Sequence, residues 1–259
     1  MRRWLAWLGI RLQARLAWPA DALAGVVGDL VVAAVGVAVV LALYAHVQDL
    51  RGWSAGEVLM AWGLAQASLA GTRAAFGGLW VLNRRYVLGG DLDRVLLRPA
   101  DPFAQVMVDH ADPGPLWGLV AGLGVFGWGA GEAGVALGVV QVLAVVGFVF
   151  GGVALIAGVL TTMASVGFFV RHEGSAVGLA AQGIAFAHVP LDALPPAWAL
   201  LVTTAVPFAF TGVVPAAWFT GHAPWAAVAW GQPLVGLAAF GLGQVVWRVG
   251  LRWYGSVGH

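Results

Sequence analysis

The chain has 259 residues, of which 61% are hydrophobic and only 10% are charged, and its formal net charge at pH 7 is +1. A soluble domain carries about 25% charged residues, so this composition indicates a membrane protein with several apolar helices, and the near-neutral charge argues against nucleic-acid binding. The chain has no Cys, and all 13 basic residues are Arg, which excludes disulfides, thiolate metal sites, Schiff-base chemistry and the Lys-dependent P-loop of nucleotide-binding proteins.

Residues 2–17 are predicted to form an amphipathic helix at the membrane surface. Leu5, Leu8, Leu12 and Leu16 share one face of a helix with 3.6 residues per turn, and neighbouring Trp side chains suit the membrane–water boundary. The alternative is a plain basic anchor without a regular apolar face. Arginines interrupt the apolar stretch and no small-residue cleavage site follows it, which argues against a signal peptide.

Six predicted membrane spans follow this helix. A spanning helix needs about 20 mainly apolar residues. The segments that meet this requirement cover residues 22–46, 56–80, 113–131, 135–169, 197–219 and 225–247. Residues 175–190 are apolar but short, which leaves open an interfacial helix, a broken helix that leads into the fifth span, or an additional span. The predicted fold class is an all-α, polytopic membrane protein with one domain over residues 1–259.

The arginine distribution predicts how the spans are oriented. With the N-terminus in the cytosol and six spans, only Arg51 lies outside, and Arg73 lies within a span. A seventh span would move Arg248 and Arg252 outside, so six spans and two cytosolic termini are preferred. The arginines then predicted in the cytosol are Arg2, Arg3, Arg11, Arg15, Arg84, Arg85, Arg94, Arg98, Arg171, Arg248 and Arg252.

Two charged residues are predicted to lie inside the membrane. From the rise of 1.5 Å per residue, Asp29 and Arg73 would sit about 13 and 10 Å from the cytosolic edge. Charges at this depth are costly and are usually paired. The sequence therefore predicts an ion pair between Asp29 and Arg73. The alternative is that Asp29 faces a cavity and attracts a cationic substrate.

The segment from Leu88 to Phe103, LGGDLDRVLLRPADPF, is a charged stretch between long apolar segments. A Gly-Gly pair breaks the chain, and Asp91 is predicted to cap a short helix over Leu92–Arg98 that Pro99 terminates. This helix would present an apolar ridge to a groove on a partner, and the alternative is a solvated connecting loop. The ridge would consist of Leu92, Val95 and Leu96.

No catalytic or metal-binding constellation stands out. Asp109, His110 and Asp112 are ligand types that crowd together before Pro113. They are interpreted instead as a polar segment at the membrane surface that leads into the third span. The chain is therefore predicted to be a non-enzymatic subunit with no catalytic residues, no metal site and no cofactor site of its own.

The segment GGDLDRVLLRPADPFAQV resembles the signature loop of type-2 ATP-binding cassette (ABC) exporter permeases. More narrowly, it resembles a bacterial subfamily with the pattern G-x-L-D-x-x-L-L-R-P-x-x-P. That pattern falls on Gly90, Leu92, Asp93, Leu96, Leu97, Arg98, Pro99 and Pro102. Three further stretches resemble the family in the same order along the chain: Pro190–Asp192, Val206–Ala216 and Gly250–Gly258.

The resemblance implies a six-span permease of the bacterial cytoplasmic membrane that pairs with a second permease, identical or homologous. It also implies a cytosolic ABC ATPase dimer that holds the ATP and Mg, and a coupling helix in the charged loop. The substrate would be amphipathic, such as a drug-like molecule, a lipid or a peptide. The implied coupling residues are Asp91, Leu92, Asp93, Arg94, Leu96, Leu97, Arg98 and Pro99.

Other functions remain open on the residues alone. An ATP-independent channel or secondary carrier would depend on charge chemistry within the spans, and such charge is sparse here. An intramembrane enzyme would need a catalytic constellation, and none is recognisable. A separate ATPase is therefore the favoured energy source.

Overall fold

The structure of the protein, a computed structural model, describes residues 19–169 and 176–255. These residues are mainly helical, and the β pairing found among them is an isolated bridge between Leu50 and Trp53. The interfacial helix predicted over residues 2–17 lies outside the described residues, as does Arg171. The all-helical part of the predicted fold class is confirmed for the described part of the chain.

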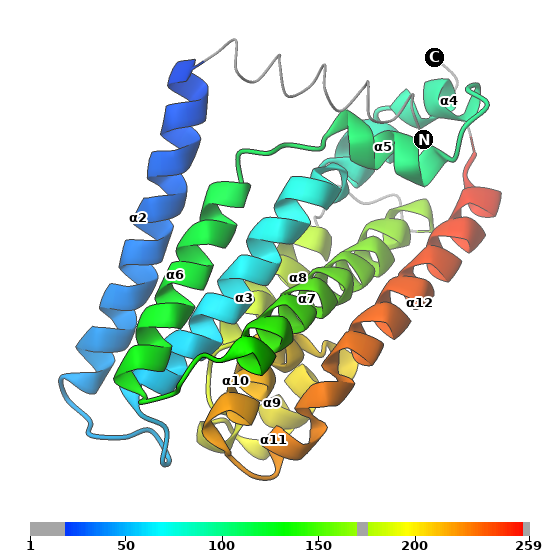
Figure 1. Ribbon diagram of the computed structural model, residues 1–259. Helices are drawn as coiled ribbons and strands as arrows, with labels where there is room; N and C mark the ends of the chain where they lie inside the picture. Colours follow the sequence, from blue (N-terminus) through cyan, green and yellow to red (C-terminus); the bar gives the residue numbers. More distant parts are fainter. Residues whose placement is uncertain (1–18, 170–175, 256–259) are drawn as a thin grey trace.

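Five long helices lie side by side in the order α2, α6, α3, α7 and α12 (Figure 1). Their bounds are α2 Pro19–Tyr44, α3 Ala55–Phe76, α6 Leu116–Glu132, α7 Val139–Ser165 and α12 Gln232–Trp253. Three helical stretches of the described chain are long and apolar enough to cross a membrane, namely Leu23–Tyr44, Val139–Phe168 and Trp225–Trp253. Their length and composition agree with a multi-pass membrane protein.

Glycine lets the long helices approach closely. A Cβ on Gly122 of α6 would lie 2.8 Å from both the Ala67 nitrogen and the Gly63 oxygen of α3. In the same way, Gly236 of α12 lies directly against the backbone of Gly151 in α7. Without side chains at these crossings the backbones pack by van der Waals contact, which drives helix association where lipid replaces water.

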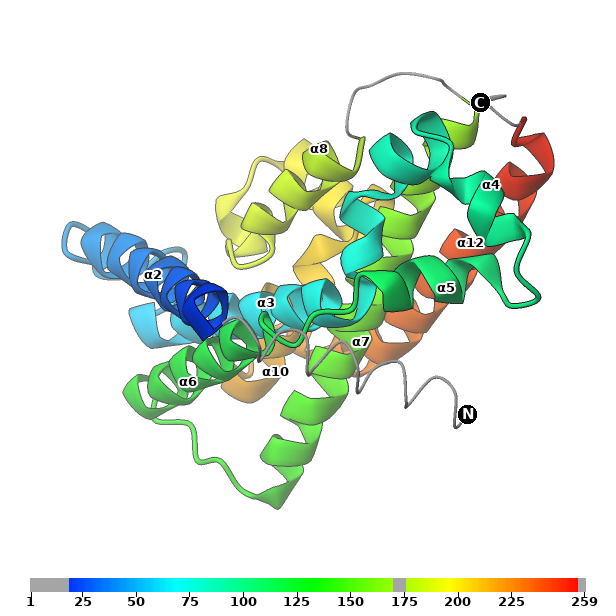
Figure 2. The same cartoon turned by 90° about the horizontal axis from the view of Figure 1, so that it is seen from above.

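The bundle has two different ends. One, here called the α4 end, carries α4 (Asp91–Leu96), α5 (Pro102–Asp109) and the C-terminus of α12, and Figure 2 views it from above. The opposite end, the α11 end, carries α11 (Trp225–Val228) and the loop between α2 and α3. Each end has its own buried cluster: Phe103, Phe168 and Trp247 belong to the first, and Trp53, Phe126 and Phe148 to the second.

The helix predicted over residues 197–219 is not continuous, which corrects the predicted fifth span. This stretch consists of α9 (Pro196–Leu200), a π-helix (Leu201–Ala205), a 3₁₀ turn (Phe208–Thr211) and α10 (Val213–Thr220). Pro207 has no N–H to continue a helix, and Gly212 leaves the helical region with φ −139° and ψ −77°. The pattern of apolar residues could not reveal these breaks, because the broken segment is as hydrophobic as a span.

Both ends of this broken segment lie at the α11 end. Leu194 packs against the cluster there, and His222 contacts Glu57 at the start of α3, whereas Phe208 at the middle packs into the cluster of the α4 end. Residues 194–222 therefore enter and return on one side, and we call them the re-entrant segment. Figure 1 shows α9, α10 and α11 gathered there.

Within the predicted segment 175–190, the described residues 176–190 form a broken helix. α8 (Ala176–Gly183) begins beside the 3₁₀ turn Gly77–Trp80 and continues as the 3₁₀ turn Ile184–Phe186. The chain then reaches the 3₁₀ turn Leu191–Ala193, where Leu191 packs into the cluster of the α11 end. The backbone N–H of Val213 donates to the Ala187 oxygen at 2.7 Å, so this helix also holds the re-entrant segment.

The other predicted spans differ from the structure mainly at their ends. The second stops being α-helical at Phe76 and continues as a 3₁₀ turn and a π-helix (Leu82–Leu88). The fourth ends in a 3₁₀ turn at Val166–Phe168, and the sixth is preceded by another at Ala229–Gly231. Apolar composition locates a helix well but says little about where its last turn tightens.

Candidate functional site

The charged loop folds as a short helix on a turn made by glycine. Gly90, with φ +76°, occupies the N-cap position of α4, a backbone conformation that residues with a side chain rarely adopt. The prediction that Asp91 caps this helix is therefore wrong, because Asp91 is its first residue. Its carboxylate instead accepts from Arg85 Nε at 2.8 Å, and Arg94 Nη1 lies 3.7 Å away.

The arginine beside it favours the ionised form of Asp91. The hydrogen bond from Arg85 holds the pKa of the Asp91 carboxyl below its ordinary value, and the same bond raises the pKa of Arg85. A carboxylate in the first turn also suits the positive end of the helix. Because Arg85 is exposed and Asp91 only half-buried, their contact orients the turn between the π-helix and α4 more than it stabilises the fold.

The helix is shorter than predicted, and a different face is apolar and exposed. α4 ends at Leu96, and Leu97 and Arg98 follow in a turn. Leu92 and Val95 are buried in the cluster below, so they cannot belong to an exposed ridge as predicted. Leu96 is 44% exposed and Leu97 is 86% exposed. The apolar tip of the loop therefore consists of Leu96 and Leu97.

A neighbouring helix supports this tip. Asp101 Oδ1 accepts from the Ala104 N–H at 2.8 Å and so caps α5. From within α5, the buried Gln105 Nε2 donates to the Ala100 oxygen at 2.9 Å and to the Val95 oxygen at 3.3 Å. Sequence reasoning missed Gln105, although a polar side chain one turn after a cap in an apolar helix is a usable signal.

Aromatic contacts join this support to the long helices. The ring of Phe103 in α5 meets Trp247 of α12 at a centroid distance of 5.6 Å and Phe240 at 6.3 Å. Trp247 is fully buried and also meets Phe168 at 5.2 Å. Through these rings α5 packs directly against α12, and α12 packs against the 3₁₀ turn that follows α7.

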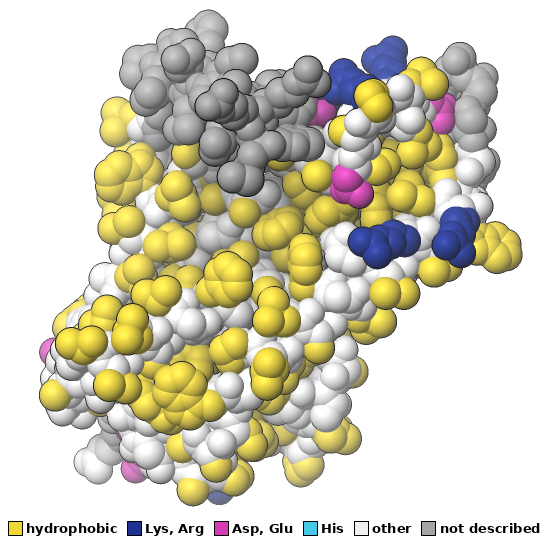
Figure 3. All heavy atoms as spheres, turned by 45° about the vertical axis from the view of Figure 1, so that its right-hand side comes forward, with side chains coloured by type: hydrophobic (Ala, Val, Ile, Leu, Met, Phe, Trp, Pro, Cys, Tyr) yellow, Lys and Arg dark blue, Asp and Glu magenta, His cyan; other side chains and the backbone are white. Residues whose placement is uncertain are grey.

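The remaining residues predicted for coupling lie on the outside of the loop. Arg94, Arg98 and Pro99 are exposed, and Asp93 is half-buried. In the space-filling view, arginine side chains gather toward the α4 end and hydrophobic side chains cover the middle of the molecule (Figure 3). The exposed arginines of that end are Arg84, Arg85, Arg94, Arg98, Arg248 and Arg252.

Asp29 and Arg73 lie next to each other. Arg73 Nη1 is 3.7 Å from Asp29 Oδ1, and the Arg73 side chain is 48% exposed whereas Asp29 is buried. The second oxygen, Asp29 Oδ2, accepts from the Gly118 N–H of α6 at 3.1 Å. A carboxylate of α2 therefore caps the first turn of α6, an interaction between two spans that the sequence does not reveal.

Polar side chains of the segment before the third span make hydrogen bonds within the protein. Tyr86 Oη and His110 Nε2 are 3.1 Å apart, and Asp112 Oδ1 accepts from the Gly114 N–H at 2.9 Å. In the described part of the chain, no group of three or more His, Asp or Glu side chains is placed to hold a metal ion.

A groove opens on the side of the bundle between α2, α3 and the α8 helix. Its volume is about 350 Å³ and its wall is mostly apolar, with Val32, Val35, Trp62 and Leu69 among the lining residues. Polar groups lining the same groove are Gln66, Gln182 and His188. A few polar groups in an apolar wall are typical of sites for amphipathic molecules.

Comparison with known proteins gives one family. The sequence model described as "ABC-2 family transporter protein" matches residues 30–258. Comparisons with curated proteins and with solved structures give no match.

Proposed function

The chain belongs to the ABC-2 family of transporter proteins, and we propose that it is the permease subunit of an ATP-driven exporter. Membership makes it a transmembrane permease and implies association with an ABC ATPase and the membrane. The observation that carries the finer proposal is the apolar tip Leu96–Leu97, exposed at the arginine-rich end and held on a buried, hydrogen-bonded support.

The proposed topology has six crossings with the α4 end in the cytosol of a bacterium. The crossings are α2, α3, α6, α7, residues 176–189 and α12, so residues 176–189 replace the predicted fifth span. This arrangement keeps the exposed arginines of the α4 end on the cytosolic side and leaves Arg51 outside, as the positive-inside rule favours. Both termini are then cytosolic.

In the proposed mechanism the ATPase supplies the energy, and the permease supplies the movement. The partner's ATP and Mg drive closure of the ATPase dimer, which pushes on the tip and on the coupling residues around it. Gln105 and Phe103 pass the displacement to α12 through Trp247. The bundle then switches between an inward-open and an outward-open state, a rigid-body change biased by nucleotide.

The lateral groove is the proposed entry for an amphipathic substrate. It combines an apolar wall with amide and imidazole groups, so it suits a drug-like molecule, a lipid or a peptide that arrives from the bilayer. A second permease chain, identical or homologous, would enclose the open side of the groove. Asp29 is a weaker candidate for substrate contact, because Gly118 and Arg73 already engage both of its oxygens.

A single substitution tests the coupling role. The tagged chain is purified from its native membranes in mild detergent, and an ABC ATPase is sought by mass spectrometry and by ATP hydrolysis. Leu97→Asp places a charge in the proposed contact and should reduce the recovered ATPase about tenfold or more, the loss typical of a central apolar anchor. The helix should stay folded, because Leu97 is 86% exposed.

The matched control is Leu137→Asp, which makes the same change at a 43%-exposed leucine in the loop at the α11 end. It should leave ATPase recovery unchanged. Equal recovery with Leu97→Asp and the wild type would refute the coupling role of the tip. If the wild-type chain carries out transport without any ATPase, the whole proposal is wrong.

A further inference from the structure

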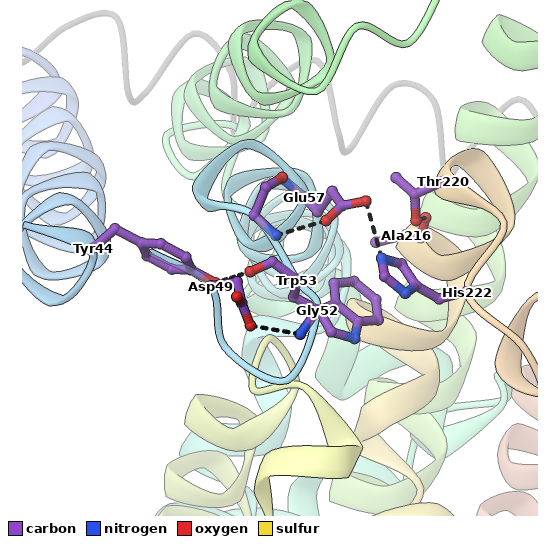
Figure 4. Close-up of polar contacts among 9 residues, drawn as sticks. Tyr44, Asp49, Gly52, Trp53, Glu57, Ala216, Thr220 and His222 are labelled. Carbon is purple, nitrogen blue, oxygen red and sulfur yellow. Dashed lines mark hydrogen bonds and ion pairs between the residues drawn. The ribbon is translucent and has the colours of Figure 1, made fainter. Parts of the chain in front are cut away.

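The re-entrant segment packs on the α11 end through the rings of Trp218 and Phe219, and among the described residues one long-range side-chain hydrogen bond joins it there as well. His222 Nε2 lies 2.9 Å from Glu57 Oε1, and the side chains are 24% and 15% exposed (Figure 4). The imidazole also stacks on the fully buried Trp53, with ring centroids 4.2 Å apart and planes 9° from parallel. The contact joins residues 165 positions apart, at the return of the re-entrant segment and the start of α3.

Glu57 is fixed in place by the helix that it begins. Its Oε2 accepts from the Ser54 N–H at 2.7 Å, and Ser54 caps α3 in return. This capping box orients the carboxylate before His222 reaches it. Because an ionised carboxylate only accepts hydrogen bonds, the histidine nitrogen that faces it donates, in the neutral and in the protonated ring alike.

The other side-chain hydrogen bonds of the re-entrant segment are local. Thr203, Thr204, Thr211 and Thr220 each donate to a carbonyl three or four residues earlier. Within the described chain, His222 therefore makes the one side-chain hydrogen bond between this segment and α3. The first half of α10 is fully buried and the Val213 N–H is bonded to Ala187, so the His222 contact adds to a packed interface and fixes the return of the segment.

The ionisable groups around the contact are mostly acidic. Asp49 Oδ1 accepts from the Gly52 N–H, and Tyr44 Oη donates to the Trp53 oxygen (Figure 4). Glu132 of α6 accepts a hydrogen bond from Trp128 Nε1 and lies beside the first turn of α3. Arg51 is the one arginine of the α2–α3 loop, which also contains the exposed His46. Around His222 itself, α10 and α11 contain no other ionisable side chain.

We infer that Glu57 and His222 form a proton-sensitive latch that holds the re-entrant segment closed over the α11 end. A proton on His222 turns a hydrogen bond to a carboxylate into an ion pair, so the latch is stronger when His222 is protonated and weaker when it is neutral. The consequence for transport rests on the proposed function and topology. Acid outside the cell slows the opening that releases substrate.

Hydrogen–deuterium exchange of the purified chain in nanodiscs tests the latch without any transport. After correction for the intrinsic exchange rate, amides of residues 213–225 should exchange about fivefold more slowly at pH 5.5 than at pH 7.5. His222→Gln keeps a hydrogen-bond donor without the charge, and Glu57→Gln keeps the capping box without the carboxylate. Both variants should lose this pH difference.

The matched control for exchange is His46→Gln, which removes a histidine of the same end that bonds only to Ala42 of its own helix. It should retain the fivefold difference. Equal pH dependence in the wild type and in His222→Gln would overturn the latch. So would loss of the difference in His46→Gln alone.

A second measurement tests the consequence for transport. The complex with its co-purified ATPase is placed in liposomes, and only ATPases that face the bath at pH 7.5 receive ATP. Lowering the luminal pH from 7.5 to 5.5 should slow ATP hydrolysis about threefold in the wild type and not in His222→Gln. If no ATPase co-purifies, the proposed function fails, and the exchange experiment still decides the latch. Equal slowing in both chains overturns the regulatory role.

Discussion

The α4 end and the α11 end use their few charged groups in opposite ways. At the α4 end, Arg85 and Asp91 pair on the surface, and Leu96 and Leu97 beside them are 44% and 86% exposed. At the α11 end, Glu57 and His222 pair within a half-buried contact that joins two distant segments. Exposed charges at the α4 end are therefore available to a partner, whereas the Glu57–His222 contact at the α11 end joins two segments of the same chain.

The largest expected effect concerns the buried base of the exposed tip. Leu92→Asp would place a carboxylate in the cluster below α4, where Leu92 is fully buried, and should lower the free energy of unfolding by about 4 kcal/mol. Leu97→Asp, five residues later on the exposed side, should lower it by less than about 0.5 kcal/mol. Unfolding in detergent, followed by circular dichroism, measures both.

If the two aspartate variants are equally stable, then the two faces of α4 do not differ as described. The α4 end would then be a solvated loop throughout, and the contrast with the α11 end would be lost.

An intermediate effect is expected between the two ends, where Asp29 joins α2, α3 and α6. Asp29→Ala would leave the Gly118 N–H without its acceptor and Arg73 without its counter-ion, at a cost of about 2 kcal/mol in the free energy of unfolding. Asp29→Asn keeps an acceptor and should cost about 1 kcal/mol. The same unfolding measurement compares them, and equal losses would contradict the role of Asp29 as a cap for α6.

The smallest effect tests whether proton sensitivity is confined to the α11 end. Because Arg85 lowers the pKa of Asp91, their contact contributes fully above the ordinary carboxyl pKa of about 3.9 and is lost as the pH falls below it. Amide exchange of residues 91–98, corrected for the intrinsic rate, should therefore be equal at pH 5.5 and 7.5. Asp91→Asn should speed it about twofold at both pH values.

A pH difference in this window at the α4 end would show that proton sensitivity is general rather than a property of the Glu57–His222 contact. The wild-type chain, measured over residues 91–98 and 213–225 in one experiment, provides the internal comparison.

Much of the fold could be predicted because membrane helices are recognisable from their apolar composition. The segments around α2, α6 and α7 were located to within about one turn at each end, whereas α12, Gln232–Trp253, begins and ends almost two turns later than the predicted 225–247. The fifth span was misplaced, since residues 197–219 are as apolar as a span. The close approach at Gly212 depends on Ala61 and Ala187, which are distant in sequence.

The candidate site was predicted in position but not in orientation. The charged loop, its helix and its arginines follow from local residues. Which leucines face inward does not, because in a helix of six residues, Asp91–Leu96, the apolar positions fit either face. Packing against Phe103 and Val106 selects Leu92 and Val95 for the core.

By itself, the sequence determined that this chain is a helical membrane protein without a P-loop, with a charged loop that distinguishes one end. Those properties follow from the composition and charge of each segment and need no contact between distant residues. Only the tertiary structure decided that Leu96 and Leu97 form the exposed tip, that Asp29 caps α6 and that His222 meets Glu57. Each of these depends on bringing together groups far apart along the chain, and their separations are set by helix packing rather than by any local pattern.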